Sequence, residues 1–398
     1  MQEQQPKPES VLSIFSAFLK LGSTSFGGPI AHLGYLRTEF VERRKWLDDK
    51  AYADLVGLCQ FLPGPASSQV GFALGVSQRG VPGGVAAWLG FTLPSAVVMI
   101  AFAYGLQLWH GASESGWLHG LQVAAVAVVA QAVWSMGRQL CPDRTRASLA
   151  AAAAWLLLAW PSAFAQICAI GVGAVLGWGL LQPEAEAPTE TRYPASRGIA
   201  RIAWVLLIGL LIVLPIAARS TGNYAVSMFD GFFRSGSLVF GGGHVVLPLL
   251  REEVVPRGWI SESDFLAGYG MAQALPGPLF TFAAYLGAAS NGQPNGWIGG
   301  CVALCAIFLP GLLVVLGALP YWNDWRRRPA IRAAMNGVNA AVVGILVAAL
   351  YDPIFISAVR SRMDFALALA GFALLVFWRV SPVWVVGAAA LAGGLLAP

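Results

Sequence analysis

Charged side chains are scarce in this 398-residue sequence. Asp, Glu, Lys and Arg together make up 11% of the residues, whereas 57% are hydrophobic. Soluble domains carry roughly 25% charged residues. A water-soluble globule of this composition would expose large apolar patches, and disorder needs far more polar residues. The composition therefore predicts a protein that uses the lipid bilayer as its solvent.

Clusters of metal-binding or catalytic residues are also lacking. The four histidines are scattered, and none of the five cysteines has the spacing of a metal site or a disulfide framework: Cys59, Cys141, Cys168, Cys301 and Cys305. The sequence contains no Ser/His/Asp arrangement of the kind that a membrane-embedded enzyme would need. We therefore expect neither cofactor nor catalysis. The polar segment 1–10 lacks the cationic and apolar regions of a signal peptide, so we expect it to be a short cytoplasmic tail.

The excess of basic residues does not predict a nucleic-acid partner. The net charge is +5, but 21 of the 25 basic residues are arginines, and most lie in short loops between apolar segments. This distribution is the positive-inside bias of a membrane protein, not a basic groove.

Thirteen apolar segments alternate with short polar loops. Only helices and closed barrels cross lipid, and the strand alternation of a barrel is absent. We therefore predict an all-α polytopic membrane protein with about thirteen hydrophobic crossings. The segments are 11–28, 51–79, 84–109, 117–136, 147–160, 162–181, 201–218, 224–242, 265–290, 296–318, 330–351, 364–379 and 381–397.

The chain contains an internal duplication. FSAFLKLGSTSFGG (15–28) aligns with FDGFFRSGSLVFGG (229–242) at an offset of 214 residues, and an R-x-E motif and LPGP (62–65 and 275–278) follow in both copies. Chance similarity between apolar helices does not reproduce these motifs in one order. We therefore predict repeats at 1–181 and 224–398, a polar linker at 182–200 and a bridging helix at 201–223.

Loop charges indicate that the repeats are inverted. The cluster Arg326–Arg332 is strongly basic, whereas the equivalent loop 110–116 has no cation. Opposite charge character predicts opposite sides of the membrane, with the N-terminus cytoplasmic and the C-terminus periplasmic. This assignment holds if each interrupted segment crosses once. If the interrupted segments are re-entrant hairpins, the Arg326–Arg332 loop lies outside.

A Pro-Gly-Pro sequence interrupts one apolar segment in each half, at Pro63–Pro65 and Pro276–Pro278. Proline cannot continue the helical hydrogen-bond ladder, and the second half-helix then begins with free N–H groups that face anions. Ser67, Ser68 and Thr281 follow these breaks. Two PGP sequences that only kink helices for packing are the alternative, but their recurrence after Gln60 and Gln273 favours a substrate site.

Cations recur inside the apolar segments. Lys20 and Arg234 occupy equivalent positions six residues before FGG. A cation at the bilayer centre costs about 2.5–3.5 kcal/mol, so it usually pairs or lines a cavity. The two could converge on an anion or could snorkel to the interface. The predicted substrate-binding residues are Lys20, Gly27, Gly28, Gln60, Gly64, Ser67, Ser68, Arg234, Gly241, Gly242, Gln273, Gly277 and Thr281.

Other charged residues suggest gating and coupling. The R-x-E residues are expected to form interfacial ion pairs that fix the gating loops, and Asp54 is a candidate proton-coupling carboxylate, although the start of a helix suits it equally well. The predicted gating and structural residues are Arg37, Glu39, Pro63, Pro65, Arg251, Glu253, Pro276 and Pro278.

Together, FGGPIAHLGYLRTEF…LPGPASSQVG (26–71) and FGGGHVVLPLLREEV…QALPGP (240–278) resemble the paired domains of the chromate ion transporters over essentially the whole chain. The resemblance implies a bacterial inner-membrane exporter of chromate that confers resistance. Its partners would be chromate and the lipid bilayer, and a homodimer stays open. Transport of sulfate or another oxyanion is the main alternative, and a non-ion translocator explains the cations less well.

Overall fold

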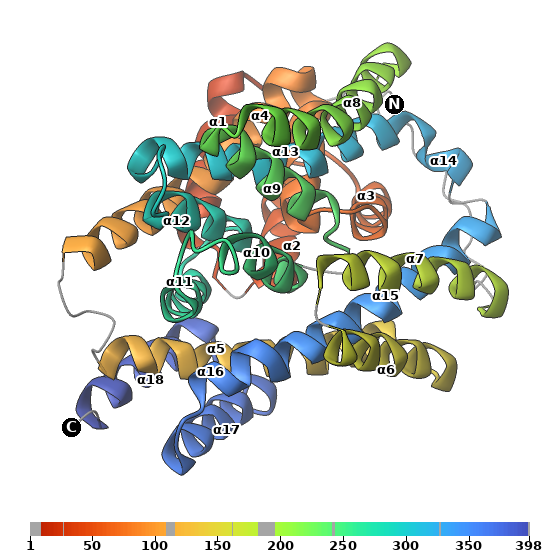
Figure 1. The fold of residues 1–398 in the computed structure, drawn as a ribbon. Helices are drawn as coiled ribbons and strands as arrows, with labels where there is room; N and C mark the ends of the chain where they lie inside the picture. Colours follow the sequence, from red (N-terminus) through yellow and green to blue (C-terminus); the bar gives the residue numbers. More distant parts are fainter. Residues whose placement is uncertain are drawn as a thin grey trace.

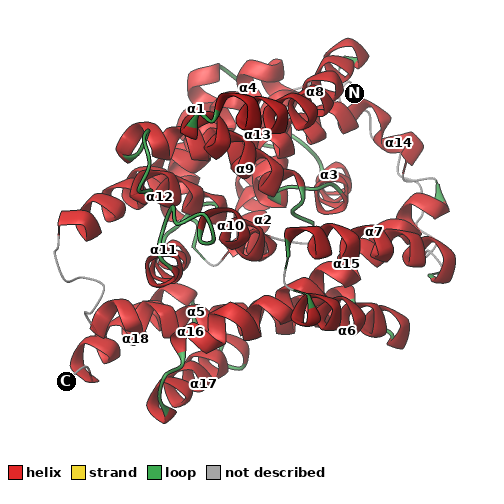
Figure 2. Ribbon diagram, viewed as in Figure 1, coloured by secondary structure: helices red, strands yellow, loops and turns green. Residues whose placement is uncertain are grey.

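The computed structural model describes residues 9–26, 28–108, 116–160, 162–181, 196–240, 243–325 and 328–396, and these residues form helices joined by loops without a strand (Figure 2). Each of the thirteen apolar segments contains helix. The all-helical prediction is therefore confirmed, whereas the number of membrane crossings stays a prediction.

The helices follow the same order in both halves. The first half contains α1 (Val11–Thr24), α2 (Gly28–Arg37), the π-helical η1 (Thr38–Arg43), α3 (Asp49–Phe61), α4 (Ala66–Leu108), α5 (Gly116–Leu140), α6 (Arg144–Ala159) and α7 (Ala163–Leu180), followed by α8 (Arg197–Thr221). The second half contains α9 (Tyr224–Ser237), η3 (Gly243–Val245), α10 (Val246–Val254), α11 (Glu262–Ala274), η4 (Leu279–Thr281), α12 (Phe282–Ala289), α13 (Gly296–Ala318), η5 (Leu319–Tyr321), α14 (Trp322–Trp325), α15 (Pro329–Ala349), η6 (Leu350–Phe355), α16 (Ile356–Ala358), α17 (Arg362–Val376) and α18 (Pro382–Leu396).

Equivalent local signals start and stop the equivalent helices α3 and α11. Asp48 caps α3 by accepting a hydrogen bond from the N–H of Ala51, and Ser261 caps α11 through the N–H of Asp264. Both helices end just before Pro-Gly-Pro, where proline removes the next backbone donor. The duplication is therefore visible in helix caps as well as in motifs.

The broken segments of the first half fold back on themselves. Glu9 precedes α1, Arg44 follows η1, and Arg79 lies at a break in α4 where the backbone leaves helical geometry. The guanidinium of Arg44 pairs with the Glu9 carboxylate (3.0 Å), and Arg79 Nε donates to the Glu9 carbonyl oxygen (2.6 Å). Hydrogen bonding from Ser13, against the effect of burial and assisted by Arg44, lowers the pKa of Glu9. The segment from α1 to η1 thus returns to the end where α1 starts. The segment from α3 to the break in α4 at Arg79 returns to the same end.

The second half closes in the same way. Tyr224 at the start of α9 bonds to Ser290 after α12 and packs its ring against Trp259, with 5.0 Å between ring centroids. The N–H of Asn291 donates to the carbonyl oxygen of Trp259 (2.9 Å). The α9–α10 and α11–α12 segments are therefore hairpins as well.

The halves exchange helices. In Figure 1, α5, α15, α6, α17 and α18 form a lower layer beneath α1, α4, α8, α9 and α13. Helix α5 of the first half packs against α17 and α18 of the second, and α15 of the second packs against α6 and α7 of the first. The backbones touch: a Cβ at Gly120 would lie 2.1 Å from Ala389 O, and one at Gly337 would lie 2.0 Å from Gly173 O.

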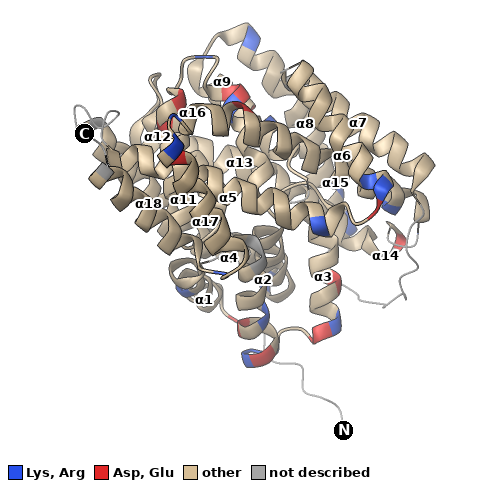
Figure 3. Ribbon diagram, turned by 90° about the horizontal axis from the view of Figure 1, so that it is seen from below, with Lys and Arg blue, Asp and Glu red and all other residues tan. Residues whose placement is uncertain are grey.

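The chain is a multi-pass membrane protein. Five helical stretches are long and apolar enough to cross a bilayer: Ala66–Leu106, Gly116–Leu140, Arg197–Thr221, Gly296–Tyr321 and Pro329–Ala358. Helix α8 exposes large aliphatic side chains such as Val205 (70%), as expected for a lipid-facing helix. Figure 3 shows most charged residues near helix ends and in loops, away from the helix bodies.

Candidate functional site

The two Pro-Gly-Pro breaks are sharp turns between half-helices. Gly64 has φ +124° and Gly277 has φ +99°, a region that strongly favours glycine. After the first break, α4 begins at Ala66, so Ser67 and Ser68 lie in its first turn, as the sequence predicts. After the second break, a short 3₁₀ turn (Leu279–Thr281) precedes α12.

Each break is bonded to the other half of the chain. The N–H of Gly64 donates to the carbonyl oxygen of Val239 (2.7 Å), and the N–H of Gly277 donates to that of Ser25 (3.0 Å). Ser25 and Val239 occupy equivalent repeat positions just before the FGG motifs. The two hydrogen bonds therefore form a reciprocal pair, as two repeats related by a two-fold rotation would make.

A third pair of equivalent positions lies beside the two Pro-Gly-Pro turns. Pro94 in α4 and Pro310 in α13 belong to repeated motifs, LPS (93–95) and LPG (309–311). A Cβ on Gly277 would lie 2.7 Å from Ser95 Oγ, and one on Gly64 would lie 3.0 Å from the Cα of Gly311. We name the surroundings of Gly64 and Gly277 the first and second junctions.

Several buried polar atoms near these breaks have no hydrogen-bond partner among the described residues. They are Ser25 Oγ, His32 Nδ1, Ser68 Oγ, Gln69 Oε1 and Thr92 Oγ1. His32 Nε2 lies 3.1 Å from the same Ser25 carbonyl that accepts from Gly277. The Gln69 amide donates to Pro63 O (2.8 Å) and Gly311 O (2.9 Å). Buried hydroxyls without partners suit a polar ligand.

The first half supplies more of these groups than the second. The sequence analysis did not include Ser25, His32, Gln69, Thr92 or Ser95 among the predicted site residues. His32 has no histidine at the equivalent position, and Phe282 stands where Gln69 would recur, so the repeat did not reveal either. The repeated motifs LPS (93–95) and LPG (309–311) are the sequence signal that would have identified Ser95 as a candidate site residue.

The other predicted ligands near the breaks differ in exposure. Ser67 and Thr281 are buried, and Thr281 Oγ1 donates to Pro278 O (2.9 Å). Gln60 is exposed, whereas Gln273 Nε2 lies 3.4 Å from His244 Nδ1. Gly28 begins α2 with φ +77°. Gly27, Gly241 and Gly242 lie outside the described residues.

The two intramembrane cations have different surroundings. Arg234 bonds to Asp230 (2.9–3.1 Å) on its own helix and to Glu253 (3.4 Å). Lys20 is exposed near the end of α1 and forms no ion pair with the described residues. Lys20 is thus the cation whose charge stays available to a ligand.

The R-x-E residues form equivalent ion-pair networks. Arg37 pairs with Asp49 (2.7 Å), and Arg251 pairs with Glu262 (3.0 Å) at the equivalent position. The glutamate of each motif pairs with an arginine four residues later: Glu39 with Arg43 (3.4 Å) and Glu253 with Arg257 (2.7 Å). Both networks tie the end of one hairpin to the start of the next, which is compatible with the predicted gating role.

Asp54 lies on α3 and accepts a hydrogen bond from the indole of Trp322 (3.0 Å). This contact joins the first half to α14 of the second. Proton coupling through Asp54 stays a prediction.

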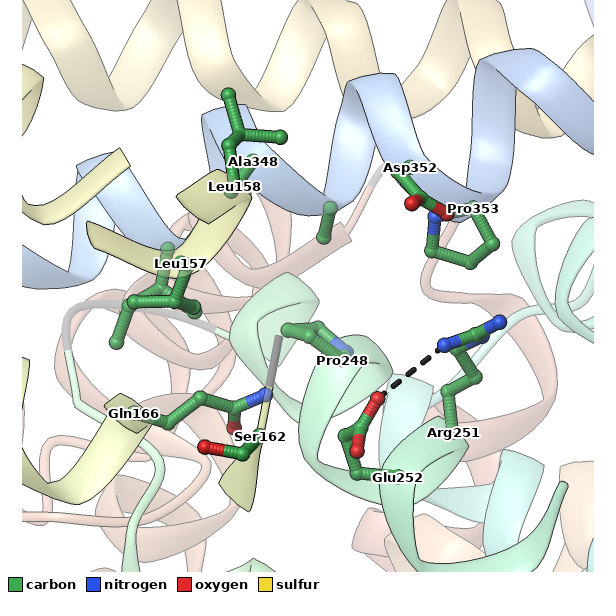
Figure 4. A pocket seen from close by; sticks show the side chains of 12 residues that line it. Leu157, Leu158, Ser162, Gln166, Pro248, Arg251, Glu252, Ala348, Asp352 and Pro353 are labelled. Carbon is green, nitrogen blue, oxygen red and sulfur yellow. Dashed lines mark hydrogen bonds and ion pairs between the residues drawn. The ribbon is translucent and has the colours of Figure 1, made fainter. Parts of the chain in front are cut away.

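A pocket of about 50 Å³ lies where α6 and α7 meet α10, α15 and η6 (Figure 4). Gln166, Glu252, Arg251 and Asp352 line it, and Arg251 is paired with Glu252 (3.2 Å). Two carboxylates beside one already paired guanidinium disfavour a dianion. We therefore do not assign the substrate site to this pocket.

Comparisons with known proteins agree with one another. The family described as "Chromate transporter" matches residues 12–178 and 226–394, once in each half. A chromate transport protein of Pseudomonas aeruginosa is 29% identical over the whole chain and 95% of its own length. A probable chromate transport protein of Synechococcus elongatus is 29% identical over 85% of this chain and 84% of its own length.

A shorter relative corresponds to about one half of the chain. The uncharacterized transporter YwrA of Bacillus subtilis is 31% identical over 98% of its own length but covers only 44% of this chain. No solved structure shows significant similarity. A unit of half this length thus exists as a protein of its own, which agrees with the internal duplication.

Proposed function

The chain belongs to the chromate transporter family, whose members are transporters and not enzymes, and on that premise we propose that it exports chromate from the cytoplasm across the bacterial inner membrane and thereby confers resistance. Chromate is a tetrahedral dianion. A site for it needs hydroxyl and N–H donors and positive charge in a place shielded from water.

The reciprocal junctions carry this proposal. Gly64 and Gly277 each bond to the other half, and Ser25, Ser68 and Thr92 offer buried hydroxyls without partners. The first turn of α4 adds the positive end of a helix dipole. We infer that chromate binds at these junctions, mainly through first-half groups, with Lys20 supplying charge.

We further propose inverted repeats whose broken segments are re-entrant. Helices α1 and α3, of 14 and 13 residues, measure about 20 Å, which is less than the roughly 30 Å of hydrocarbon. The contacts among Glu9, Arg44 and Arg79 support a return of both first-half hairpins to one side. The sequence-based case that placed the 326–332 loop outside counted 11–28 and 224–242 as full crossings. When these segments return as well as the Pro-Gly-Pro segments, the loops at 138–146 and 326–332 share the side of the N-terminus, in agreement with the positive-inside rule.

The membrane potential favours export. Each charge that moves across the bilayer gains about 2.3 kcal/mol per 100 mV, so a dianion leaving a negative interior gains about twice that amount. Uptake against this potential would require coupled cations, and the described intramembrane acids are few: Asp54 bonds to Trp322, and Asp230 to Arg234.

Flux into inverted membrane vesicles tests the proposal. Labelled chromate should accumulate when an interior-positive potential is imposed and should stop accumulating when an ionophore abolishes it. Vesicles without the protein are the control. Preferential accumulation of labelled sulfate over chromate would replace chromate with the competing oxyanion, and flux that ignores the potential would refute electrical driving.

A further inference from the structure

Helices α3 and α11 occupy equivalent repeat positions but have different neighbours. An offset of 213 residues relates Ser263, Ala267 and Gly270 on α11 to Lys50, Asp54 and Gly57 on α3. An offset of 217 relates Gly120–Leu121–Gln122 on α5 to Gly337–Val338–Asn339 on α15, and the equivalent backbone contacts of Gly120 and Gly337 support this alignment. Each contact of α11 with α5 therefore has a defined counterpart between α3 and α15.

Helix α11 packs tightly on α5. The Gln122 amide donates to the carbonyl oxygen of Ser263 (3.1 Å). A Cβ on Gly270 would lie 2.5 Å from Leu121 O, and Ala267 is buried in a cluster with Leu118 and Leu121. No side chain larger than that of glycine fits at position 270. This side of the molecule is closed.

The equivalent surface of α3 is open. A Cβ on Gly57 would meet nothing within 4 Å among the described residues, although Trp322 bonds to Asp54 beside it. Lys50 is exposed, and extensive packing between α3 and α15 is absent from the described part of the chain. No hydrogen bond joins Asn339, the counterpart of Gln122, to α3 among the described residues, and the neighbouring Val338 is buried by other contacts (4% exposed).

The flanking ion pairs show the same difference. The side chains of Arg37 and Asp49 are 43% and 65% exposed, whereas those of Arg251 and Glu262 are each 25% exposed. The two sides therefore differ in the packing of α11 and α3, with its backbone contact and amide hydrogen bond, and in the exposure of the flanking ion pairs. In both respects, the first half is the open one.

We propose that this structure is the state open on the side of the N-terminus, and that the opposite state of the cycle closes α3 onto α15, with Gly57 against Val338 and the Asn339 amide donating to the carbonyl oxygen of Lys50. In that state α11 separates from α5. The inference rests on the proposed transport function. It assigns Gly57 to a closing surface, although a Cβ on Gly57 would meet no described residue within 4 Å in this structure. Repeats related by a two-fold rotation can exchange conformations in this way.

The first test substitutes Gly57→Leu. Because Gly57 faces open space, the variant should insert and fold normally, but its side chain should prevent closure and reduce chromate flux by about tenfold or more, as expected for overpacking in a tight contact. Gly209→Leu on α8 is the matched control, since Gly209 also has nothing within 4 Å among the described residues. Gly57→Leu flux equal to that of the control would overturn the proposal.

The second test is crosslinking in the full chain with its five cysteines replaced. Lys50→Cys with Asn339→Cys reports the proposed closed contact, and Ser263→Cys with Gln122→Cys reports the observed one. Vesicles are treated with a short bismaleimide, washed and assayed for flux. A protease site placed in the segment 182–195 shows crosslinking as a chain that stays intact after cleavage.

Both pairs should crosslink, each should stop flux, and the 50/339 pair should react more slowly. If the 50/339 pair never crosslinks in vesicles whose untreated protein transports chromate, alternation between these two contacts is refuted. Crosslinking needs no chromate. An absence of chromate flux in the unsubstituted protein therefore counts against the proposed function alone and leaves the crosslinking result readable.

Discussion

Lys20 and Arg234 show how equivalent residues can take different roles. Lys20 is exposed and lacks an ion pair among the described residues, whereas Arg234 is paired with Asp230 and Glu253. In the proposed function, the Lys20 charge compensates the dianion when the anion leaves water. We therefore expect charge at position 20 to affect binding and charge at position 234 to affect both binding and structure.

Replacing Lys20→Ala should reduce chromate flux sharply with little loss of stability, because surface substitutions usually change stability by about 0.5 kcal/mol or less. Vesicle flux and thermal unfolding in detergent measure the two effects. Lys20→Arg keeps the charge and should retain most of the flux. Full flux in Lys20→Ala would remove Lys20 from the substrate site.

Replacing Arg234→Ala should destabilise the protein as well as slow transport. The substitution leaves the buried carboxylate of Asp230 without a guanidinium, whereas Glu253 keeps its pair with Arg257, and an uncompensated buried charge costs about 3–5 kcal/mol. Thermal unfolding should show a clearly lower midpoint than for Lys20→Ala, and Arg234→Lys should recover part of it. An unchanged midpoint would mean that these pairs contribute little.

At the scale of elements, the Pro-Gly-Pro turns link α3 to α4 and α11 to η4, and each bonds to the opposite half. The glycine is needed twice over, for its positive φ and for its close approach to Gly311 or Ser95. A change at one turn therefore acts on both repeats.

Gly64→Ala and Gly277→Ala should each impair transport while membrane insertion stays normal. A non-glycine residue at such a φ costs about 1–3 kcal/mol, and the added Cβ would crowd Gln69 or Ser95. Flux per inserted protein, measured against Gly209→Ala, checks this expectation. Normal flux in both variants would reduce the turns to packing kinks.

The elements were largely predictable from the sequence, because apolar runs and prolines specify helices and their breaks. The return of α1 and α3 to their starting side was not predictable, since it depends on contacts of Glu9 with Arg44 and Arg79 across 35 and 70 residues. Likewise, the motif PGP predicts a turn at Gly64, but its partner Val239 comes from tertiary packing. The unpaired hydroxyls of Ser25 and Thr92 carry no motif at all.

For the whole molecule, the re-entrant arrangement predicts which loops face each compartment. In intact cells, an impermeant maleimide should label Asn291→Cys and Ser361→Cys but not Lys45→Cys or Arg328→Cys, each in a cysteine-free background. Labelling after permeabilisation is the control for reactivity. Labelling of positions 45 and 291 from the same side would rule out inverted repeats.

The exchange of helices between the halves also bears on how the protein is made. Helix α5 leaves the ribosome long before α17 and α18, against which it packs, and α6 and α7 must wait for α15. Gly173 has no partner backbone until Gly337 is inserted, and Gly120 has none until Ala389 is inserted. We therefore expect the first half to stay incompletely packed during synthesis until α15, α17 and α18 have been inserted.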